Sequence, residues 1–239
     1  GGQEKARALE GATVAPILPC DGGVLWALAK NRASEQNTLM RSDGDGWAPV
    51  EEFHEKKIVD LYRTSDGRIW VAEDGNGLYE IRPDKGPAQA QHHLQGLNVT
   101  TLAEDSDGRV WAGLWGRGVR VLKDGTWEAH LSGEKSYVFT IKEDADGAIW
   151  VATNASGLWR YDGTRWVNDL KDEGAINMLA VTSDGRVWIS TQMQGGLRYW
   201  DGKQWRVSLK SPLPIRTMLE TKDGTILAGG VLDGLHVRN

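Results

Sequence analysis

The sequence predicts an all-β protein, a six-bladed β-propeller in which each blade has four antiparallel strands. The first observation is a recurring motif of Asp-Gly, any residue, an aliphatic residue and tryptophan, which occurs at Asp66–Trp70, Asp107–Trp111, Asp146–Trp150 and Asp184–Trp188. The second is its spacing. With looser copies at Asp21 and Asp223, the aspartates stand at positions 21, 66, 107, 146, 184 and 223. A period of about 40 residues is typical of propeller blades.

Each period contains four β-prone segments, as the third repeat shows. Its segments are Val99–Glu104, Val110–Leu114, Val119–Leu122 and Trp127–Leu131. Asp-Gly pairs separate the first from the second and the third from the fourth. Glycine supplies the positive φ that tight hairpins need, so these pairs predict hairpin turns. Four antiparallel strands per repeat make one blade.

Tryptophan is the most informative residue type in the composition. Nine of the 12 tryptophans occupy two repeating positions, one in the second strand and one at the start of the fourth. An aromatic binding surface is one interpretation, but a residue required at the same position in every repeat favours packing between blades. A large indole face can be buried only if neighbouring blades stack.

The repeats define one domain, residues 1–239, with six blades. The blades span about 12–52, 57–94, 98–131, 137–169, 175–209 and 214–239. The last blade has residues for only three strands. We therefore expect residues 4–9 to supply its fourth strand and close the ring, which would hide an exposed sheet edge.

Charge and composition limit the partners. The net charge is −5, which disfavours binding to nucleic acids or to anionic membranes. A single cysteine, Cys20, excludes a disulfide within the chain. No apolar run is long enough to span a membrane. We expect a monomer without membrane insertion.

The repeats resemble the two-component regulator propeller family. The resemblance is carried by Glu104–Gly108 with Val110-Trp111, by Glu143–Thr153 followed by Gly157–Gly163, and by Gly195–Tyr199. It implies an extracytoplasmic sensor module, periplasmic or secreted, and many propellers of this family respond to oligosaccharides. Such sensors usually have more blades and further domains than this sequence contains.

Candidate ligand-binding residues lie in two places. Loops after the second strands vary from repeat to repeat on a constant frame, and loops on a rigid scaffold often carry function. They supply Asp74, Asn76, Trp115, Arg117, Asn154, Gln192 and Asp233. Trp115 is the strongest candidate, because it lies outside the repeating tryptophan positions. The first strands, which we expect to line the central channel, add Asp60, Asn177 and Arg216.

Enzyme and metal motifs give little support to catalysis. The Asp-x-Asp-Gly turns lack the later carboxylates of a calcium loop. We expect no cofactor, no metal and no catalytic residues. The leading hypothesis is a non-enzymatic propeller that binds a small ligand such as an oligosaccharide. The alternatives are a protein–protein interaction scaffold and a lyase or hydrolase acting over the channel, in which His236 would act with Glu73 or Asp233.

Overall fold

The computed structural model describes residues 12–31, 37–44, 46–82, 85–192, 195–211, 213–230 and 234–238. The strands of these residues form six antiparallel sheets in which sequence neighbours pair. The chain divides into two compact units, residues 1–100 and 101–239, and the boundary falls inside the strand β9. Each unit has its own hydrophobic core.

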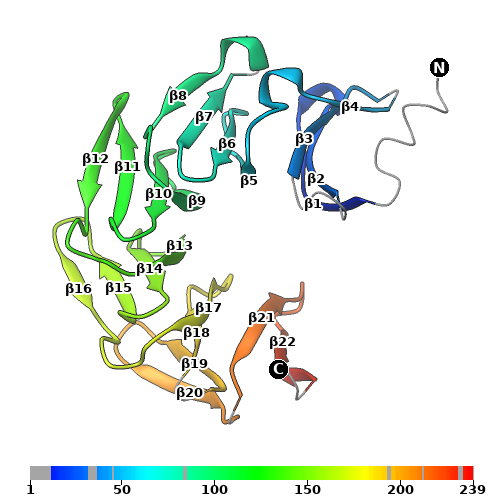
Figure 1. Ribbon diagram of the computed structural model, residues 1–239. Coiled ribbons are helices and arrows are strands. Elements are labelled where there is room, and N and C mark those ends of the chain that lie inside the picture. Colours follow the sequence, from blue (N-terminus) through cyan, green and yellow to red (C-terminus); the bar gives the residue numbers. More distant parts are fainter. Residues whose placement is uncertain are drawn as a thin grey trace. The chain divides into compact units, whose positions relative to one another are not determined.

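Unit 1 contains two four-stranded sheets (Figure 1). The first comprises β1 (Ala12–Pro19), β2 (Leu25–Asn31), β3 (Asn37–Ser42) and β4 (Trp47–Pro49). The second comprises β5 (Ile58–Arg63), β6 (Ile69–Glu73), β7 (Gly77–Ile81) and β8 (Gln91–His93). Three short 3₁₀ helices lie in the connections, at Asp21–Gly23, Glu51–Phe53 and Pro87–Gln89.

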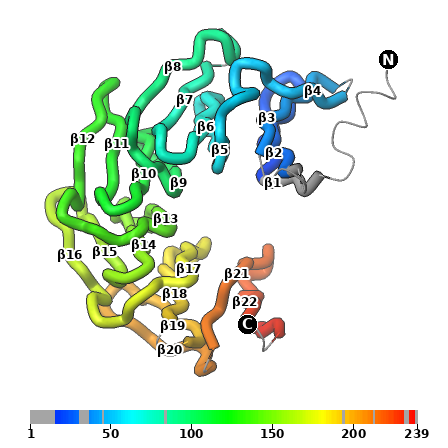
Figure 2. Tube along the Cα trace, in the orientation of Figure 1, coloured from blue at the N-terminus to red at the C-terminus, as the bar shows by residue number. Residues whose placement is uncertain are grey.

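Unit 2 contains the other four sheets. The first of these comprises β9 (Val99–Glu104), β10 (Val110–Leu114), β11 (Val119–Lys123) and β12 (Thr126–His130), and the second comprises β13 (Val138–Glu143), β14 (Ile149–Thr153), β15 (Leu158–Tyr161) and β16 (Trp166–Asn168). The third comprises β17 (Ile176–Val181), β18 (Val187–Thr191), β19 (Leu197–Trp200) and β20 (Trp205–Leu209). The fourth comprises β21 (Ile215–Glu220), β22 (Ile226–Gly230) and β23 (Leu235–Arg238). Figure 2 follows the chain in this unit from each outer fourth strand back to the inner first strand of the next sheet.

The all-β class and the six repeated sheets of a propeller are confirmed. In the last five sheets the first strands begin at Ile58, Val99, Val138, Ile176 and Ile215, each within one residue of the predicted start of its blade. The last described sheet has three strands. Residues 4–9 lie outside the described residues, so their pairing with β23 stays a prediction.

The repeating tryptophans pack between successive sheets, as expected. Trp150 of β14 is fully buried and meets Trp205 of the next sheet edge to face, with ring centroids 5.9 Å apart. Trp111 of β10 meets Trp166 in the same way at 6.4 Å. In unit 2 each core cluster therefore draws its residues from two adjacent sheets.

A glycine at the start of the third strand is required by close packing. At Gly157 the backbone has φ +74°, and a Cβ would lie 1.9 Å from the carbonyl oxygen of Leu170. Gly118 and Gly196 meet carbonyl oxygens at the corresponding place, at 2.1 Å each. Only glycine fits there, because the chain leaving the fourth strand occupies the volume of a side chain.

No helix among the described residues is long and apolar enough to cross a membrane.

Candidate functional site

The first strands carry a bulge at the same position in several sheets. In β13, β17 and β21 the pairing with the second strand skips one residue, which is Phe139, Asn177 or Arg216. In unit 1 the bulge of β5 falls at Val59. A β-bulge leaves one residue outside the ladder and re-aims its side chain, and bulges are common beside binding sites. We call these four residues the bulge position.

The bulge position holds a polar pair in unit 2. A guanidinium nitrogen of Arg216 donates a hydrogen bond of 3.0 Å to Oδ1 of Asn177, which connects two successive first strands. Arg216 is exposed, whereas Asn177 is 7% exposed. The buried Nδ2 of Asn177 has no hydrogen-bond partner among the described residues. An unmet buried donor is costly and is a common feature of functional sites.

Phe139 adds an apolar side chain to this row. Phe139 is 45% exposed and lies on β13, the first strand that precedes β17. In Figure 1 the first strands β13, β17 and β21 lie at the inner side of the sheets of unit 2. The row therefore offers one aromatic ring on β13 and one cation on β21, with Asn177 of β17 between them.

Trp115 forms the second part of the site, in the loop between β10 and β11. Its side chain is 60% exposed. Its backbone makes an antiparallel bridge with Tyr137, and the two rings meet edge to face with centroids 5.6 Å apart. Gly116, at φ +67°, donates from its backbone to the carbonyl of Ser136 at 3.2 Å. The indole is therefore exposed but held on a fixed backbone.

Asn154, a predicted ligand-binding residue, positions this loop. The side-chain Oδ1 of Asn154 accepts a hydrogen bond from the backbone amide of Tyr137 at 2.8 Å. The backbone amide of Asn154 donates to the Tyr137 carbonyl at 3.0 Å. The residue joins the β14–β15 loop to the connection before β13. Its carboxamide oxygen is thus engaged in holding Tyr137 against Trp115.

Glu134 lies buried beside the same connection, and sequence reasoning missed it. It is 8% exposed and accepts hydrogen bonds from the hydroxyl of Ser136, from Ser156 at 2.9 Å and from the indole of Trp159 at 3.0 Å. Burial alone would raise its pKa, but these hydrogen bonds outweigh burial and lower the pKa below its usual range. The ionised carboxylate therefore fixes the loop next to Tyr137.

The predicted loop residues of unit 1 are held by contacts to the β6–β7 hairpin and to the connection before β5. Lys57 donates to Asp74 at 2.5 Å, in a pair that is partly exposed. The side chain of Asn76 donates to Glu73 at 2.8 Å, and so does the hydroxyl of Tyr79. These contacts shape the β6–β7 loop.

The remaining predicted residues have separate positions. Burial raises the pKa of Asp60, which accepts a hydrogen bond from the backbone amide of Leu61. Arg117 and Gln192 are exposed. Asp233 lies outside the described residues. Arg117 is thus the predicted cation nearest in sequence to the exposed Trp115.

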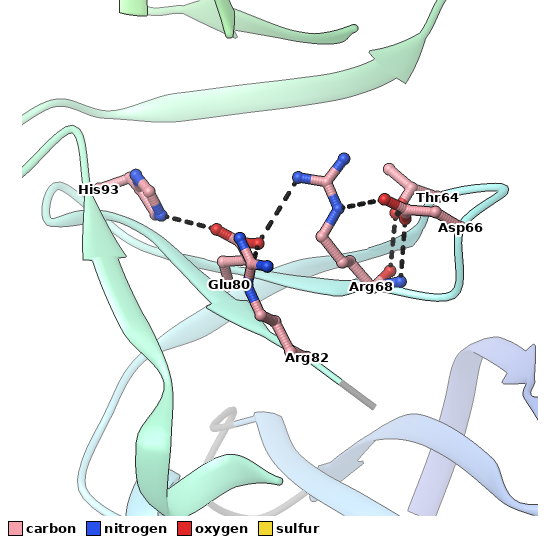
Figure 3. A network of polar contacts seen from close by, with 6 residues as sticks. All are labelled: Thr64, Asp66, Arg68, Glu80, Arg82 and His93. Atoms are coloured by element: carbon pink, nitrogen blue, oxygen red, sulfur yellow. Dashed lines mark hydrogen bonds and ion pairs between the residues drawn. The ribbon is translucent and has the colours of Figure 1, made fainter. Parts of the chain in front are cut away.

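A further polar network lies in the β5–β8 sheet of unit 1 (Figure 3). Glu80, 2% exposed, is surrounded by Arg82 at 3.1 Å, His93 at 3.1 Å and Arg68 at 3.5 Å. Arg68 also contacts Asp66 at 2.6 Å. A buried carboxylate needs such compensation. These side chains stabilise the sheet.

The histidines do not gather on the first strands. His92 and His93 lie in β8, His130 in β12 and His236 in β23. His130 accepts a hydrogen bond from the indole of Trp166 at 3.2 Å and packs against Tyr161. Among the described residues no three His, Cys, Asp or Glu side chains form a group suited to a metal ion.

The family comparison reaches two of the repeats. Residues 93–116 and 132–155 match the model described as two component regulator propeller. These two segments are similar to two-component regulator propeller repeats. Each matched segment contains a first strand, an Asp-Gly turn and a second strand with its buried tryptophan. A search of curated protein sequences finds no match.

Solved structures share the fold. An extracellular domain of a hybrid two component system from B. thetaiotaomicron aligns over 100% of this chain, with TM-score 0.69 and 16% identity. The chain spans 35% of that structure's length. Virginiamycin B lyase from Staphylococcus aureus aligns over 96% of this chain and 85% of its own, with TM-score 0.68 and 15% identity. YCF48 bound to D1 peptide aligns over 90% and 74%, with TM-score 0.60 and 15% identity.

Proposed function

We propose that the chain is a non-enzymatic binding module of an extracytoplasmic sensor, periplasmic or secreted, that recognises a small ligand such as an oligosaccharide. The two-component regulator propeller repeats support the sensor role. The likeness to an extracellular domain of a two component system supports the location. The proposed binding surface is the loop face of unit 2, which carries Trp115, Tyr137 and Arg117.

The observation that carries the proposal is the exposure of Trp115. An indole that is 60% exposed leaves a large apolar area in water, although its backbone is fixed against Tyr137. A rigid aromatic side chain loses little conformational entropy on binding. The apolar face of a sugar ring fits a flat indole, and the exposed Arg117, two residues later in the same loop, offers hydrogen-bond donors for a hydroxyl group.

Isothermal titration against a panel of neutral and uronic-acid oligosaccharides tests the proposal. Trp115→Ala should weaken binding of any hit about fivefold or more, since a good aromatic contact contributes about 1–3 kcal/mol. Trp115→Phe should retain part of the affinity. Val207→Ala is the matched control, because Val207 is 58% exposed but lies on β20. An unchanged dissociation constant for Trp115→Ala would exclude this surface.

Arg216 offers a second, independent variant. Its guanidinium is exposed and already oriented by Asn177. If the ligand is a uronic-acid oligosaccharide, Arg216→Gln should weaken its binding and leave binding of neutral sugars unchanged. Arg165→Gln, at an exposed arginine before β16, is the charge-matched control.

The alternative proposal is a protein-interaction scaffold. Tryptophan, tyrosine and arginine dominate the energetics of protein interfaces, and Trp115, Tyr137 and Arg117 are residues of these three types. A structural neighbour is bound to a peptide. If no oligosaccharide binds and a protein partner is captured by the wild type but not by Trp115→Ala, the scaffold interpretation holds instead.

A further inference from the structure

A separate cavity of about 320 Å³ lies in unit 1, between the β1–β4 and β5–β8 sheets. Its walls include the β1–β2 turn and Gly67 of the β5–β6 turn. It is therefore at the opposite end of these strands from the β6–β7 loop. A volume of this size is within the range of small-molecule sites.

Three arginines line this cavity, Arg41 of β3, Arg63 of β5 and Arg82 after β7, against one lining carboxylate, Asp21. The chain as a whole has net charge −5, so this is a local excess of positive charge. Arg63 contacts Asp21 at 3.3 Å, but the Asp21 side chain is 93% exposed and the pair is screened by water. Arg82 is compensated in part by the buried Glu80 (Figure 3).

Arg63 retains an unmet donor. Its Nε is buried and has no hydrogen-bond partner among the described residues. A guanidinium presents its N–H groups in a fixed planar fork that matches a carboxylate. The contact to Asp21 uses Nη2, so the Nε edge is left to another acceptor.

Another part of the lining is apolar. Trp26, Ile69 and Ile81 line it, and each is 5% exposed or less. A bare inorganic anion would leave this surface without contacts, whereas a carboxylate with an aromatic or aliphatic body would cover it. We propose that this cavity binds a small organic carboxylate, with Arg63 and Arg41 holding the carboxylate and Trp26, Ile69 and Ile81 contacting its apolar body.

Cys20 provides a direct readout, because the only cysteine of the sequence lines the same cavity. Burial raises the pKa of its thiol, with Arg63 acting in the opposite direction. Iodoacetate and iodoacetamide both react with the thiolate, so the ratio of their rates does not depend on the thiolate fraction. The ratio therefore reports whether the surroundings of Cys20 attract or repel an anionic reagent relative to a neutral one.

The first experiment measures the rate with iodoacetate divided by the rate with iodoacetamide, for Cys20 and for glutathione as the free-thiol reference. In the folded chain the ratio should exceed the reference about threefold or more, since a nearby guanidinium attracts the anion. Arg63→Gln and Arg41→Gln should each lower it, and Arg165→Gln in unit 2 should not. Arg41 is exposed, so its variant keeps the test valid if Arg63→Gln fails to fold. A ratio equal to the reference would overturn the proposal.

The second experiment uses benzoate as the probe. Benzoate should slow alkylation of Cys20 by iodoacetamide in the wild type and lose this effect in Arg63→Gln. Benzamide has the same shape without charge and should not protect, while inorganic phosphate has charge without an apolar body. Protection by phosphate equal to that by benzoate would overturn the assignment to organic carboxylates, and no protection by benzoate would overturn the site.

Discussion

The indole nitrogen of Trp111 donates a hydrogen bond of 2.7 Å to a carboxylate oxygen of Asp105, six residues earlier. The other oxygen of Asp105 accepts the backbone amide of Arg109 at 2.9 Å. One carboxylate therefore closes the β9–β10 turn and fixes the buried tryptophan behind it. Asp144 and Trp150 repeat the arrangement at 2.7 Å, and Thr182 takes the place of the aspartate for Trp188.

Asp105→Ala should destabilise the chain by about 2–4 kcal/mol, because it leaves a buried indole N–H and turn amides without an acceptor. Asp107→Ala is the matched control, since the Asp107 side chain is 68% exposed and forms an exposed ion pair with Arg109. We expect the control to cost less than about 1 kcal/mol. Urea denaturation followed by tryptophan fluorescence measures both, and equal midpoints would contradict the role of Asp105.

The turns are also tied to the next sheet. Both the amide and the hydroxyl of Ser183 donate to Glu220 of β21, at 2.7 Å each, and Ser106 makes the same contacts with Glu143. A double-mutant cycle of Ser183→Ala and Glu220→Gln should give a coupling energy of about 0.5–1.5 kcal/mol. If the changes in unfolding free energy of the two variants were strictly additive, the hydrogen bond between the Ser183 and Glu220 side chains would contribute nothing to stability.

Acid should weaken the loop next to Trp115. The folded-state pKa of Glu134 is lowered, so its contribution to stability is present above its unfolded pKa near 4.5 and is lost as pH falls through the folded value. Glu134→Gln should therefore be less stable than the wild type at pH 7, and the difference should shrink as the pH falls below the unfolded pKa near 4.5 and through the lower folded pKa. Glu128→Gln, at an exposed glutamate of β12, is the control. A difference that does not change with pH would contradict the ionised role.

Gly157→Ala should cost far more than Gly163→Ala. Both glycines have positive φ, +74° and +91°, so both variants carry backbone strain of about 1–2 kcal/mol. Only at Gly157 would the added Cβ also meet a carbonyl oxygen, at 1.9 Å. We expect Gly163→Ala to fold with a small loss and Gly157→Ala to lose at least about 3 kcal/mol more or fail to fold. Thermal melting distinguishes them.

Deletion of residues 1–10 tests the predicted ring closure. Leu235 and Val237 of β23 are 65% and 60% exposed, and Leu219 of β21 is 62% exposed. If the N-terminal residues pair with β23, their removal should lower the melting temperature and promote aggregation through the open edge. An unchanged melting curve in a soluble variant would refute the closure.

The strand pattern could be predicted because each turn is encoded locally. Asp-Gly pairs at 107–108, 146–147 and 184–185 mark the hairpins, and the strands on both sides of each turn follow from alternation and spacing. The buried tryptophans follow from repetition. Both signals depend on residues within one repeat, so a single sequence is enough to show them.

The candidate site was less predictable because its contacts join separate repeats. The sequence predicts Asn154 as a ligand-binding residue, but it does not indicate that the Oδ1 atom accepts a hydrogen bond from the backbone amide of Tyr137, 17 residues earlier. Glu134 has no motif of its own, and its importance arises from Ser156 and Trp159 in the following strands and loops. The bulges at Phe139, Asn177 and Arg216 depend on the pairing register with the second strand, which the first strand alone does not encode.

The packing of Trp150 against Trp205 should give a spectroscopic signal that reports the contact between their two sheets. Two indoles 5.9 Å apart and nearly perpendicular couple their electronic transitions, so their circular dichroism should contain an exciton component that isolated tryptophans lack. One indole belongs to β14 and the other to β20, in the next sheet. This component would vanish when adjacent sheets separate even if every hairpin stayed intact, so spectroscopy could distinguish undocking of sheets from unfolding of strands.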